Sequence, residues 1–381
     1  MKVKQRIKLF VILAVEFLAI AIMLVLIFFA GKKVYTVTFD LNGGTLLGGD
    51  PVQKVTQGQN ATPPQVTKEG CYFLKWSGSY REVTKDVVIE AIWEYETSYG
   101  IEYNSPKDSN YCTIAGCFDD LQGDIYIGAY HGEKKVLAIE PNAFAGCEGI
   151  TRIHLLDGIL TIGENAFAGC TNLESIELPD TAFQMADSVF ADCMALEEVV
   201  LPEGLKTLGN NAFANCISLT SVTFSEGLES IGDNAFAGCV NLQNIQLPTT
   251  VAQMGEGVFA ECIALEKMVL PEALKALGND TFKNCIALTS VTLPEGLESI
   301  GENAFAGCTE LKNIILPHSL LEIGVGAFDQ QDLIICAYIK ESEKPEGWAD
   351  GWNAGDATVT WEYDPLALDT ENSSSDQQIE S

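Results

Sequence analysis

A phenylalanine recurs every 23 residues over almost half of this chain of 381 residues. A fixed period of this length is typical of stacked repeats, in which each unit is one turn of a coil. Cysteine keeps the same step three residues after each phenylalanine until Gln331 breaks the series. The spacing therefore predicts an array of nine turns that ends where Gln331 breaks the series. The two columns are Phe144, Phe167, Phe190, Phe213, Phe236, Phe259, Phe282, Phe305 and Phe328, and Cys147, Cys170, Cys193, Cys216, Cys239, Cys262, Cys285 and Cys308.

Each unit also contains a segment that predicts a β-strand. In the unit that begins at Phe167, the apolar residues Leu173, Ile176 and Leu178 are followed by Pro179. Proline ends the segment because it has no N–H group for a β-ladder. One such strand in each turn predicts a parallel sheet whose strands lie about 4.8 Å apart. A single turn cannot bury its apolar side alone, so only stacked turns offset the entropy lost on folding.

These units resemble the bacterial leucine-rich repeats of the BspA type, whose consensus reads AFxxCxxLxxIxLPxxxxxIGxxAF. The resemblance implies a mainly β or α/β solenoid, a leucine-rich-repeat array with 23-residue rungs. Departures are local: Leu156 and Ser225 replace the proline, and Ala186 replaces the glycine. The segments that begin at Met194 and Ile263 are near copies 69 residues apart, which indicates that three rungs were duplicated together.

Charge is distributed unevenly along the chain, whose formal net charge is −31. Residues 1–33 contain six basic residues and Glu16, a net charge of 6 − 1 = +5, so the remainder carries −31 − 5 = −36. Phosphate contacts need a basic surface, so we do not expect a nucleic-acid partner. The acidic surface is either simply solvated or favours partners that are basic or bridged by cations.

Residues 9–30 form an apolar run of 22 residues in which Glu16 is the one charge. A helix of this length, at about 1.5 Å per residue, spans a bilayer core. Phe28 and Phe29 stand where a cleavage site needs small residues, which favours a single transmembrane helix over a cleaved signal peptide. Four basic residues precede the run and two follow it. We therefore expect a single-pass membrane protein with a cytoplasmic N-terminus and residues 33–381 outside the cell, in the cell envelope.

Residues 34–97 alternate between apolar strand-like segments and turn signals such as Asn-Gly-Gly and Pro-Pro, which predicts a small β domain. This segment resembles the Listeria/Bacteroides repeat, also called the internalin B-type repeat. The resemblance implies a β-grasp-like module of cell-envelope proteins that serves as a spacer or an adhesion unit. Lys75 replaces the glycine that usually precedes the tryptophan. The matching positions are Phe39, Asn42, Gly43, Gly44, Gly70, Phe73, Trp76, Ala91 and Trp93.

An array of stacked turns needs a cap at each end. We expect residues 98–139 to form a linker, at Tyr99–Asp108, and an N-terminal cap rung, with the array itself at 140–330. Residues 331–363 are expected to form the C-terminal cap, in which Trp348, Trp352 and Trp361 cover the last layer. Residues 364–381 are acidic and rich in serine, which predicts a disordered tail.

Twelve cysteines on an extracellular chain suggest disulfides, but eight of them belong to the interior column. For that column we expect buried free thiols, because the position calls for a small apolar side chain. Cys112 and Cys117 are expected to share a loop, and spacing assigns no partner to them, to Cys71 or to Cys336. No Cys-x-x-Cys or His-Cys cluster indicates a zinc site.

A further column of acidic and amide residues precedes the phenylalanines. Stacked carboxylates are able to hold calcium, but they also favour the first turn of a short helix, where free N–H groups need acceptors. We expect the short helix and predict neither a metal site nor a cofactor. The column contains Glu164, Asp187, Asn210, Asp233, Glu256, Asn279 and Glu302.

Motifs for enzymatic chemistry are missing from the sequence. His131, His154 and His318 are far apart and have no partnered nucleophile, and no hydrolase, zinc-protease or phosphate-loop motif occurs. The sequences LPDTA at Leu178 and LPTTV at Leu247 have the form of sortase signals, but they lie inside the array. We therefore do not expect an enzyme, nor a protein linked to the cell wall by sortase.

The remaining candidate surface is the outer face of the predicted sheet. It contains hydroxyls, amides and acids, with no aromatic residue and one arginine, so it lacks most residue types that dominate binding energy. This composition favours weak multivalent contact or no contact. We expect an anchored surface protein that binds an extracellular protein or a glycan; the alternative is a structural spacer or envelope scaffold without a specific ligand. The candidates are Arg152, His154, Ser175, Glu177, Glu198, Ser221, Thr223, Asn244, Gln246, Lys267, Ser290, Thr292 and Asn313, with Val200, Val269 and Ile315 between them.

Overall fold

The computed structural model describes residues 33–68, 71–95, 98–118, 120–355 and 357–363. The chain divides into two compact units, Met1–Glu96 and Thr97–Ser381. The predicted membrane span at residues 9–30 and the predicted disordered tail at residues 364–381 lie outside the described residues. Within the described part of the chain, no helix has the length and apolar character needed to cross a membrane.

The N-terminal unit is built on a four-stranded mixed sheet of order β3-β1-β6-β5. Strands β1 and β6 pair in parallel at its centre, and both outer pairs are antiparallel. Val37, Phe39 and Ile89 are fully or almost fully buried, as the period-two alternation predicts. The described residues of this unit include no helix, and its β-grasp-like character stays a prediction. The strands are β1 (Val34–Asp40), β2 (Thr45–Gly48), β3 (Val52–Thr56), β4 (Gln65–Thr67), β5 (Cys71–Trp76) and β6 (Val87–Tyr95), with β2 and β4 paired separately.

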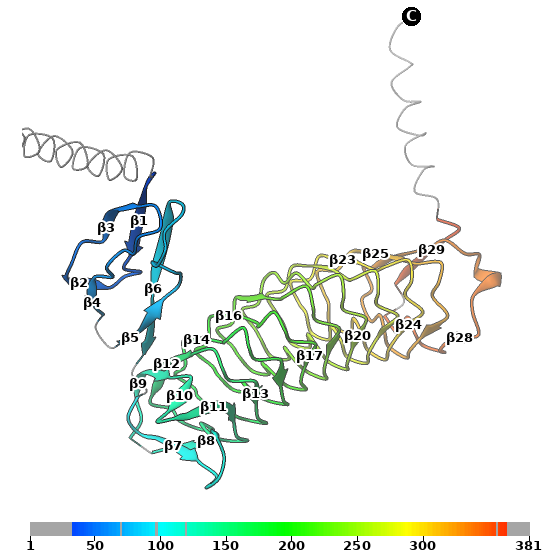
Figure 1. The fold of residues 1–381 in the computed structure, drawn as a ribbon. Coiled ribbons are helices and arrows are strands. Elements are labelled where there is room, and N and C mark those ends of the chain that lie inside the picture. The colour runs from blue at the N-terminus through cyan, green and yellow to red at the C-terminus, as the bar shows by residue number, and fades with distance from the viewer. Residues whose placement is uncertain (1–32, 69–70, 96–97, 119, 356, 364–381) are drawn as a thin grey trace, which may run out of the picture. The chain divides into compact units, whose positions relative to one another are not determined.

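The C-terminal unit is a coil of stacked turns (Figure 1), and every array turn but the one that contains residues 244–246 supplies two strands where one was predicted. One strand builds the long-strand sheet and the other the short-strand sheet. The long-strand sheet contains β9 (Gly123–Ile127), β12 (Ile150–Leu155), β14 (Ser175–Glu177), β16 (Glu198–Val200), β18 (Ser221–Thr223), β21 (Lys267–Val269), β23 (Ser290–Thr292), β25 (Asn313–Leu316), β27 (Ile334–Ala337) and β29 (Thr358–Trp361).

The short-strand sheet forms a second wall of the coil, mostly from two-residue strands that pair in parallel. Such strands are too short for alternation to reveal them in a sequence. It contains β8 (Tyr111–Cys117), β11 (Lys134–Ile139), β13 (Thr161–Ile162), β15 (Gln184–Met185), β17 (Thr207–Leu208), β19 (Ser230–Ile231), β20 (Gln253–Met254), β22 (Ala276–Leu277), β24 (Ser299–Ile300), β26 (Glu322–Ile323) and β28 (Gly347–Trp348).

Glycine follows most of these short strands because the preceding turn approaches closely. A Cβ atom added to Gly163 would lie 2.5 Å from the Pro141 nitrogen. Ala186 takes this position in one turn, and its N–H still donates to the Ile162 carbonyl at 3.0 Å. The register of that turn is therefore retained despite the departure from the repeat pattern.

The interior consists of columns of identical residues. Each of the nine array phenylalanines is fully buried, and neighbouring rings stack with centroids 5.2–5.6 Å apart. In the cysteine column, each Sγ from Cys170 to Cys308 lies within hydrogen-bond distance of a phenylalanine carbonyl of the preceding turn, as Cys239 does with Phe213 at 3.2 Å. Each turn therefore repeats the packing of the one before it.

The prediction of a free thiol holds for seven of the eight column cysteines and is wrong for Cys147. Cys147 forms a disulfide with Cys117, which lies on strand β8 of the N-terminal cap. Cys112 lies on the same strand, so the loop expected around these two cysteines is also wrong. At this first turn, the column cysteine has a cap strand as its neighbour instead of another array turn.

The acidic column does not begin short helices, and that prediction is wrong. Its residues lie in turns, where side-chain oxygens accept N–H groups of the next turn. Asp187 Oδ1 accepts the Asn210 N–H, and Asn210 Oδ1 accepts the Asp233 N–H, each at 2.8 Å. Asn279 Oδ1 accepts the Glu302 N–H at the same distance. These side chains satisfy backbone donors that stacked turns would otherwise leave without partners.

Another column holds the backbone in the left-handed region, with φ between 52° and 65° in every array turn. Asparagine, aspartate and glycine tolerate this region better than other residues. The requirement explains the Asn of each Asn-Ala-Phe segment. The column contains Asn142, Asn165, Ser188, Asn211, Asn234, Gly257, Asp280, Asn303 and Gly326.

Both ends of the array are covered. Strand β7 (Ile101–Asn104) pairs antiparallel with β8, and β10 (Tyr130–His131) pairs antiparallel with β11, so the segment expected as a linker contains a strand. At the other end, after the 3-10 helix η1 (Glu341–Glu343), Trp348 and Trp352 are buried. The Trp352 ring lies 6.0 Å from that of Phe328, the last phenylalanine of the column.

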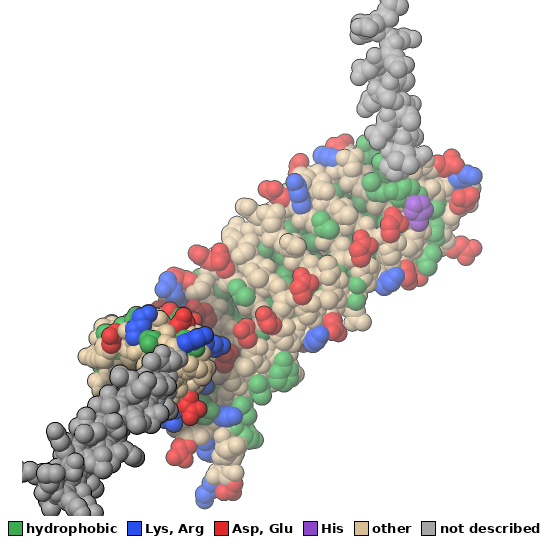
Figure 2. All heavy atoms as spheres, turned by 45° about the horizontal axis from the view of Figure 1, so that its top comes forward, with side chains coloured by type: hydrophobic (Ala, Val, Ile, Leu, Met, Phe, Trp, Pro, Cys, Tyr) green, Lys and Arg blue, Asp and Glu red, His purple; other side chains and the backbone are tan. Residues whose placement is uncertain are grey.

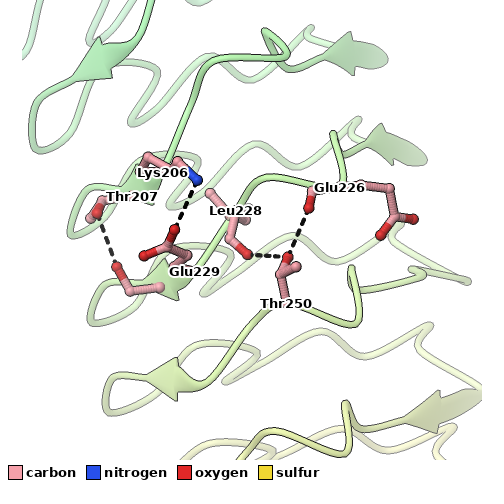
Figure 3. A network of polar contacts seen from close by, with 7 residues as sticks. Lys206, Thr207, Glu226, Leu228, Glu229 and Thr250 are labelled. Atoms are coloured by element: carbon pink, nitrogen blue, oxygen red, sulfur yellow. Dashed lines mark hydrogen bonds and ion pairs between the residues drawn. The ribbon is translucent and has the colours of Figure 1, made fainter.

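The two sortase-like sequences are integrated into the coil. Thr250 Oγ1 donates to the Leu228 carbonyl at 2.6 Å and also lies 3.1 Å from the Glu226 carbonyl (Figure 3). Thr181 Oγ1 donates to the Ile159 carbonyl of its own preceding turn at 2.9 Å. In both sequences the threonine therefore stabilises the stacking of turns.

Candidate functional site

Eleven of the thirteen candidate residues lie on strands of the long-strand sheet, on its outer face, and Asn244 and Gln246 lie between β18 and β21, where no strand forms. Twelve are exposed and His154 is half-buried. Parallel pairing places equivalent residues side by side, as for Arg152 with Ser175 and Lys267 with Ser290. Figure 2 shows acidic side chains scattered over the visible face of the array, with fewer basic ones.

At the N-terminal end of this face, the basic side chains already have intramolecular partners. The Arg152 guanidinium lies 3.9 Å from Asp124 and 3.6 Å from Glu174. His154 Nδ1 lies 2.9 Å from Glu177, and its ring stacks on Tyr126 with centroids 4.3 Å apart. Exposed ion pairs of this kind contribute little free energy. These pairs nevertheless occupy the charged groups of Arg152 and His154. The middle of the face is therefore more available to a ligand than this end.

The middle of the face has a gap in its β-ladder. Strands β18 and β21 are separated by residues 244–246, which join the ladder only through one bridge, between Asn244 and Lys267. Phe224 stands at the strand end where neighbouring turns have leucine, and its half-buried ring packs edge-to-face on Phe236 at 6.1 Å. The larger side chain of Phe224 thus lies in the turn next to the one that lacks a strand.

A hollow of about 620 Å³ lies over this gap. It is lined by Asn244, Gln246, Lys267 and Val269 of the face and by residues of the turns that follow, including Glu272. A second hollow of about 250 Å³ shares Gln246 with it and extends toward Thr223. The two hollows together combine amide, hydroxyl, ammonium and carboxylate groups with an aliphatic floor.

Sequence reasoning missed the ends of this face. Asp124 and Tyr126 on β9 extend it at the N-terminal end, in register with Arg152 and His154. Ile334 and Cys336 on β27 and Thr358 and Thr360 on β29 extend it at the C-terminal end. These strands lie outside the phenylalanine repeat. Their alternation, as in GDIYI and LIICA, is the signal that would have revealed them.

The structure does not bring the three histidines together. His131 stacks on Tyr103, His154 on Tyr126 and His318 on Tyr338, each in a different turn. In the described residues, no group of three or more His, Cys, Asp or Glu side chains is arranged to hold a metal ion. Burial raises the pKa of the Cys239 thiol from 9.0 to about 12, which makes the interior thiols poor nucleophiles.

The comparisons with known proteins agree with this repeat geometry. The family described as the BspA type leucine-rich repeat region matches residues 137–265 and 229–343, which together exceed half of the chain. The Listeria-Bacteroides repeat domain matches residues 35–88. No curated protein matches the chain.

Several solved structures are similar to the chain. A leucine-rich repeat protein of T. pallidum is 26% identical over 57% of this chain and 90% of its own, with a TM-score of 0.43. A leucine rich cell surface protein of Faecalibacterium prausnitzii is 20% identical over 72% of this chain and 96% of its own, with a TM-score of 0.40. The pneumococcal vaccine antigen PcpA is 22% identical over 64% of this chain and 81% of its own, with a TM-score of 0.39.

The classification rests on the extent of the family match. The phenylalanine column and the strand that precedes the Leu-Pro step agree with it. The chain belongs to the family of proteins that carry the BspA type leucine-rich repeat region.

Proposed function

We propose that this chain is a bacterial surface protein whose array binds an extracellular protein or a glycan through the outer face of the long-strand sheet. The observation that carries the proposal is the hollow of about 620 Å³ over Gln246 and Lys267 on this face. Concave sites with a few polar groups over an apolar floor are the usual form of binding sites. The match to a family of surface repeats supports the same conclusion.

The composition of the face supports weak contacts that gain strength by repetition. Ser221, Thr223, Ser290, Thr292 and Asn313 are exposed small polar residues. Such residues contribute hydrogen bonds but little of the buried aromatic area that dominates tight interfaces. Clustered copies on one cell surface would raise the overall affinity by increasing the effective concentration.

Anchoring through residues 9–30 remains part of the proposal. It is supported by the length of the apolar run, in which Glu16 is the one charge, and by the excess of basic residues before it. In intact cells that produce the chain, external protease should remove the array and leave residues 1–8 protected. Complete protection of the array would contradict the proposed orientation.

The test of the binding face uses a pair of matched variants of the full-length chain. Lys267→Glu with Gln246→Glu changes the hollow, and Lys206→Glu with Gln253→Glu makes the same two changes on the short-strand sheet. Multimerised wild-type chain is first screened against cells, matrix proteins and glycans. We expect binding that the first pair lowers on the order of tenfold and the second pair leaves unchanged. If the wild-type chain binds none of these above background, the proposal is wrong.

The rival function is a stiff spacer or envelope scaffold, which the near identity of the rungs favours. Deletion of the 69 residues from Met194 to Cys262 distinguishes the two, because it keeps the register of every column but removes half of the residues that line the hollow. A spacer would tolerate the shorter array, and cell-envelope integrity would be unchanged. A binding protein would lose its ligand at constant expression.

A further inference from the structure

A second exposed column lies directly after the cysteine column, apart from the proposed binding face. Its middle five members are apolar and its outer members are polar. Met194, Ile217 and Ile263 are each 42% exposed, Ile286 is 49% exposed and Val240 is half-buried. We call these five residues the apolar stripe. In full, the column contains Glu148, Thr171, Met194, Ile217, Val240, Ile263, Ile286, Thr309 and Asp332.

The stripe is continuous because its residues lie on consecutive turns. The Met194 carbonyl accepts the Ser218 N–H at 3.2 Å, and the Ile263 carbonyl accepts the Ala287 N–H at 3.1 Å. Each pair joins the stripe segment of one turn to that of the next. With turns spaced as the phenylalanine rings are, at 5.2–5.6 Å, five members extend over about 22 Å. A run of exposed aliphatic side chains of this length marks an interaction surface.

Two stripe residues have an acidic residue two positions before them and another three positions after them in the sequence. Asp192 and Glu197 flank Met194, and Glu261 and Glu266 flank Ile263, 69 residues further on. Glu197, Glu261 and Glu266 are exposed, and none of them forms an ion pair with the residues that the structure describes. An apolar centre with a charged rim is the usual anatomy of a protein interface. This rim selects a partner with basic residues.

The spacing of the turns matches one kind of partner. An α-helix advances about 5.4 Å per turn, within the 5.2–5.6 Å range that separates successive array turns. A helix laid along the coil would therefore place one apolar side chain beside each of the five stripe residues, from positions i, i+4, i+7, i+11 and i+14. The two acidic pairs are three turns apart, a distance that about 11 helical residues cover.

We propose that the apolar stripe is a docking site for a basic amphipathic α-helix of another protein. The helix lies parallel to the axis of the coil, packs its apolar face on the stripe and pairs basic residues with the two acidic pairs. A second copy of this chain is a poorer occupant, because two acidic rims would repel each other. An anionic membrane surface is disfavoured for the same reason.

The test measures binding of designed peptides to the full-length protein, purified in mild detergent. The probe is a peptide of about 18 residues with leucine at the helical positions given above and lysine beside the apolar face. One control peptide has the same composition with its leucines redistributed around the helix. Fluorescence anisotropy gives the affinity, and circular dichroism reports helix formation on binding.

Two sets of substitutions assign the site. Ile217→Thr, Ile263→Thr and Ile286→Thr together replace three of the five stripe residues, and each turn should fold, because the same column has threonine at positions 171 and 309. The control variant, Leu321→Thr with Val325→Thr, removes exposed aliphatic area, 57% and 50% exposed, from residues beside strand β26 instead. We expect the amphipathic peptide to bind on the order of tenfold more tightly than the redistributed one. The isoleucine variant should lose this preference and the control variant should keep it.

Three results would overturn the proposal. Equal binding of both peptides would mean that charge alone attracts them, and retained preference in the isoleucine variant would place the helix elsewhere. Self-association of the wild-type protein that the isoleucine variant abolishes would assign the stripe to a second copy. None of these results bears on the hollow at Gln246 and Lys267, so the docking site and the proposed binding face are tested separately.

Discussion

In the array, each buried side chain packs on its own equivalents one turn away, whereas the N-terminal unit packs unlike residues from distant strands. The Phe236 ring lies 5.5 Å from Phe213 and 5.6 Å from Phe259. Phe39, in the N-terminal unit, contacts Trp76 at 4.8 Å, and its strand pairs with β6 about 50 residues later in the chain. The array is therefore stabilised turn by turn. The N-terminal unit depends mainly on one four-stranded sheet whose strands come from distant parts of the sequence, and it should unfold as a whole.

The largest expected difference between the two units appears at alkaline pH. Burial raises the pKa of Cys170, Cys239 and Cys285 from 9.0 to about 12 and also raises the pKa of each of the other four interior thiols well above 9.0. The folded array keeps these protons while the unfolded chain releases them, so stability is full below about pH 9 and falls as the pH rises toward 12. At pH 10 the expected loss is about 1.4 kcal/mol for each thiol whose pKa is about 12.

This prediction is checked by urea unfolding of the full-length chain at pH 8 and pH 10, followed by hydrogen exchange of each unit. The N-terminal unit contains one cysteine, Cys71, which is half-buried, and should lose much less stability than the array. Replacement of Cys216 and Cys262 by alanine should make the alkaline loss smaller. If both units weakened equally and the alanine variant behaved like the wild type, the interior thiols would not be the cause.

Removal of one buried ring should lower the stability of the two units by similar amounts. The loss should be distributed differently along the chain in each unit. Phe236→Ala and Phe39→Ala each leave a cavity in a close-packed interior, at an expected cost of about 3–5 kcal/mol. In the array, hydrogen exchange should speed up near residues 213–259 and remain slow in the turns toward each end. In the N-terminal unit it should speed up throughout residues 34–95. A uniform change over all turns after Phe236→Ala would show that the array unfolds as one unit.

Reduction of the Cys117–Cys147 disulfide should weaken only the N-terminal end of the array. This bond closes a loop between residues 30 positions apart in the sequence, and such crosslinks contribute about 2–4 kcal/mol. Limited proteolysis with and without reductant should therefore reveal new cleavage near residues 98–139 and no change in the N-terminal unit. An intact mass two units below that of the reduced chain would confirm a single disulfide.

Cys239→Ala should have the smallest effect, because it leaves a small cavity and removes one weak S–H donor to the Phe213 carbonyl. The expected cost is about 1–2 kcal/mol, the same with and without reductant. Urea unfolding of variant and wild type under both conditions measures it. Cys117→Ala is the control, because its cost relative to the wild type should be larger without reductant, when the wild type keeps the Cys117–Cys147 bond. A loss for Cys239→Ala under oxidising conditions alone would mean that Cys239 takes part in a disulfide.

The repeat made much of the array predictable from sequence. Phe236, Cys239 and Leu242 share positions with residues in every turn, so one reading of the unit placed them all inside. The outward-facing residues followed from alternation, and the side chains of Ser221 and Thr223 are exposed as expected. Periodicity works here because each side chain meets its own equivalents, so the contacts of a whole column follow from those of one turn.

Features that break the period were not predictable. The Cys117–Cys147 bond joins a repeat residue to a cap residue, and no step of 23 relates the two. The gap at residues 244–246 has the same Asn-Ile-x-Leu pattern as the regular strand β25, so its sequence gives no warning. Asp187 has the residue type of a helix start, but the same side-chain oxygen serves equally well for an N–H group of the next turn, so the sequence does not separate the two structures.

The duplicated block of three turns also determines how this protein can change in length. Met194 and Ile263 begin near-identical segments, and Thr181 and Thr250 form equivalent bonds to their preceding turns. Recombination between such segments adds or removes 69 residues, or about 16 Å of coil, and leaves every column in register. Both caps keep their contacts through such an event. Related strains are therefore free to carry arrays of different reach with the same two ends.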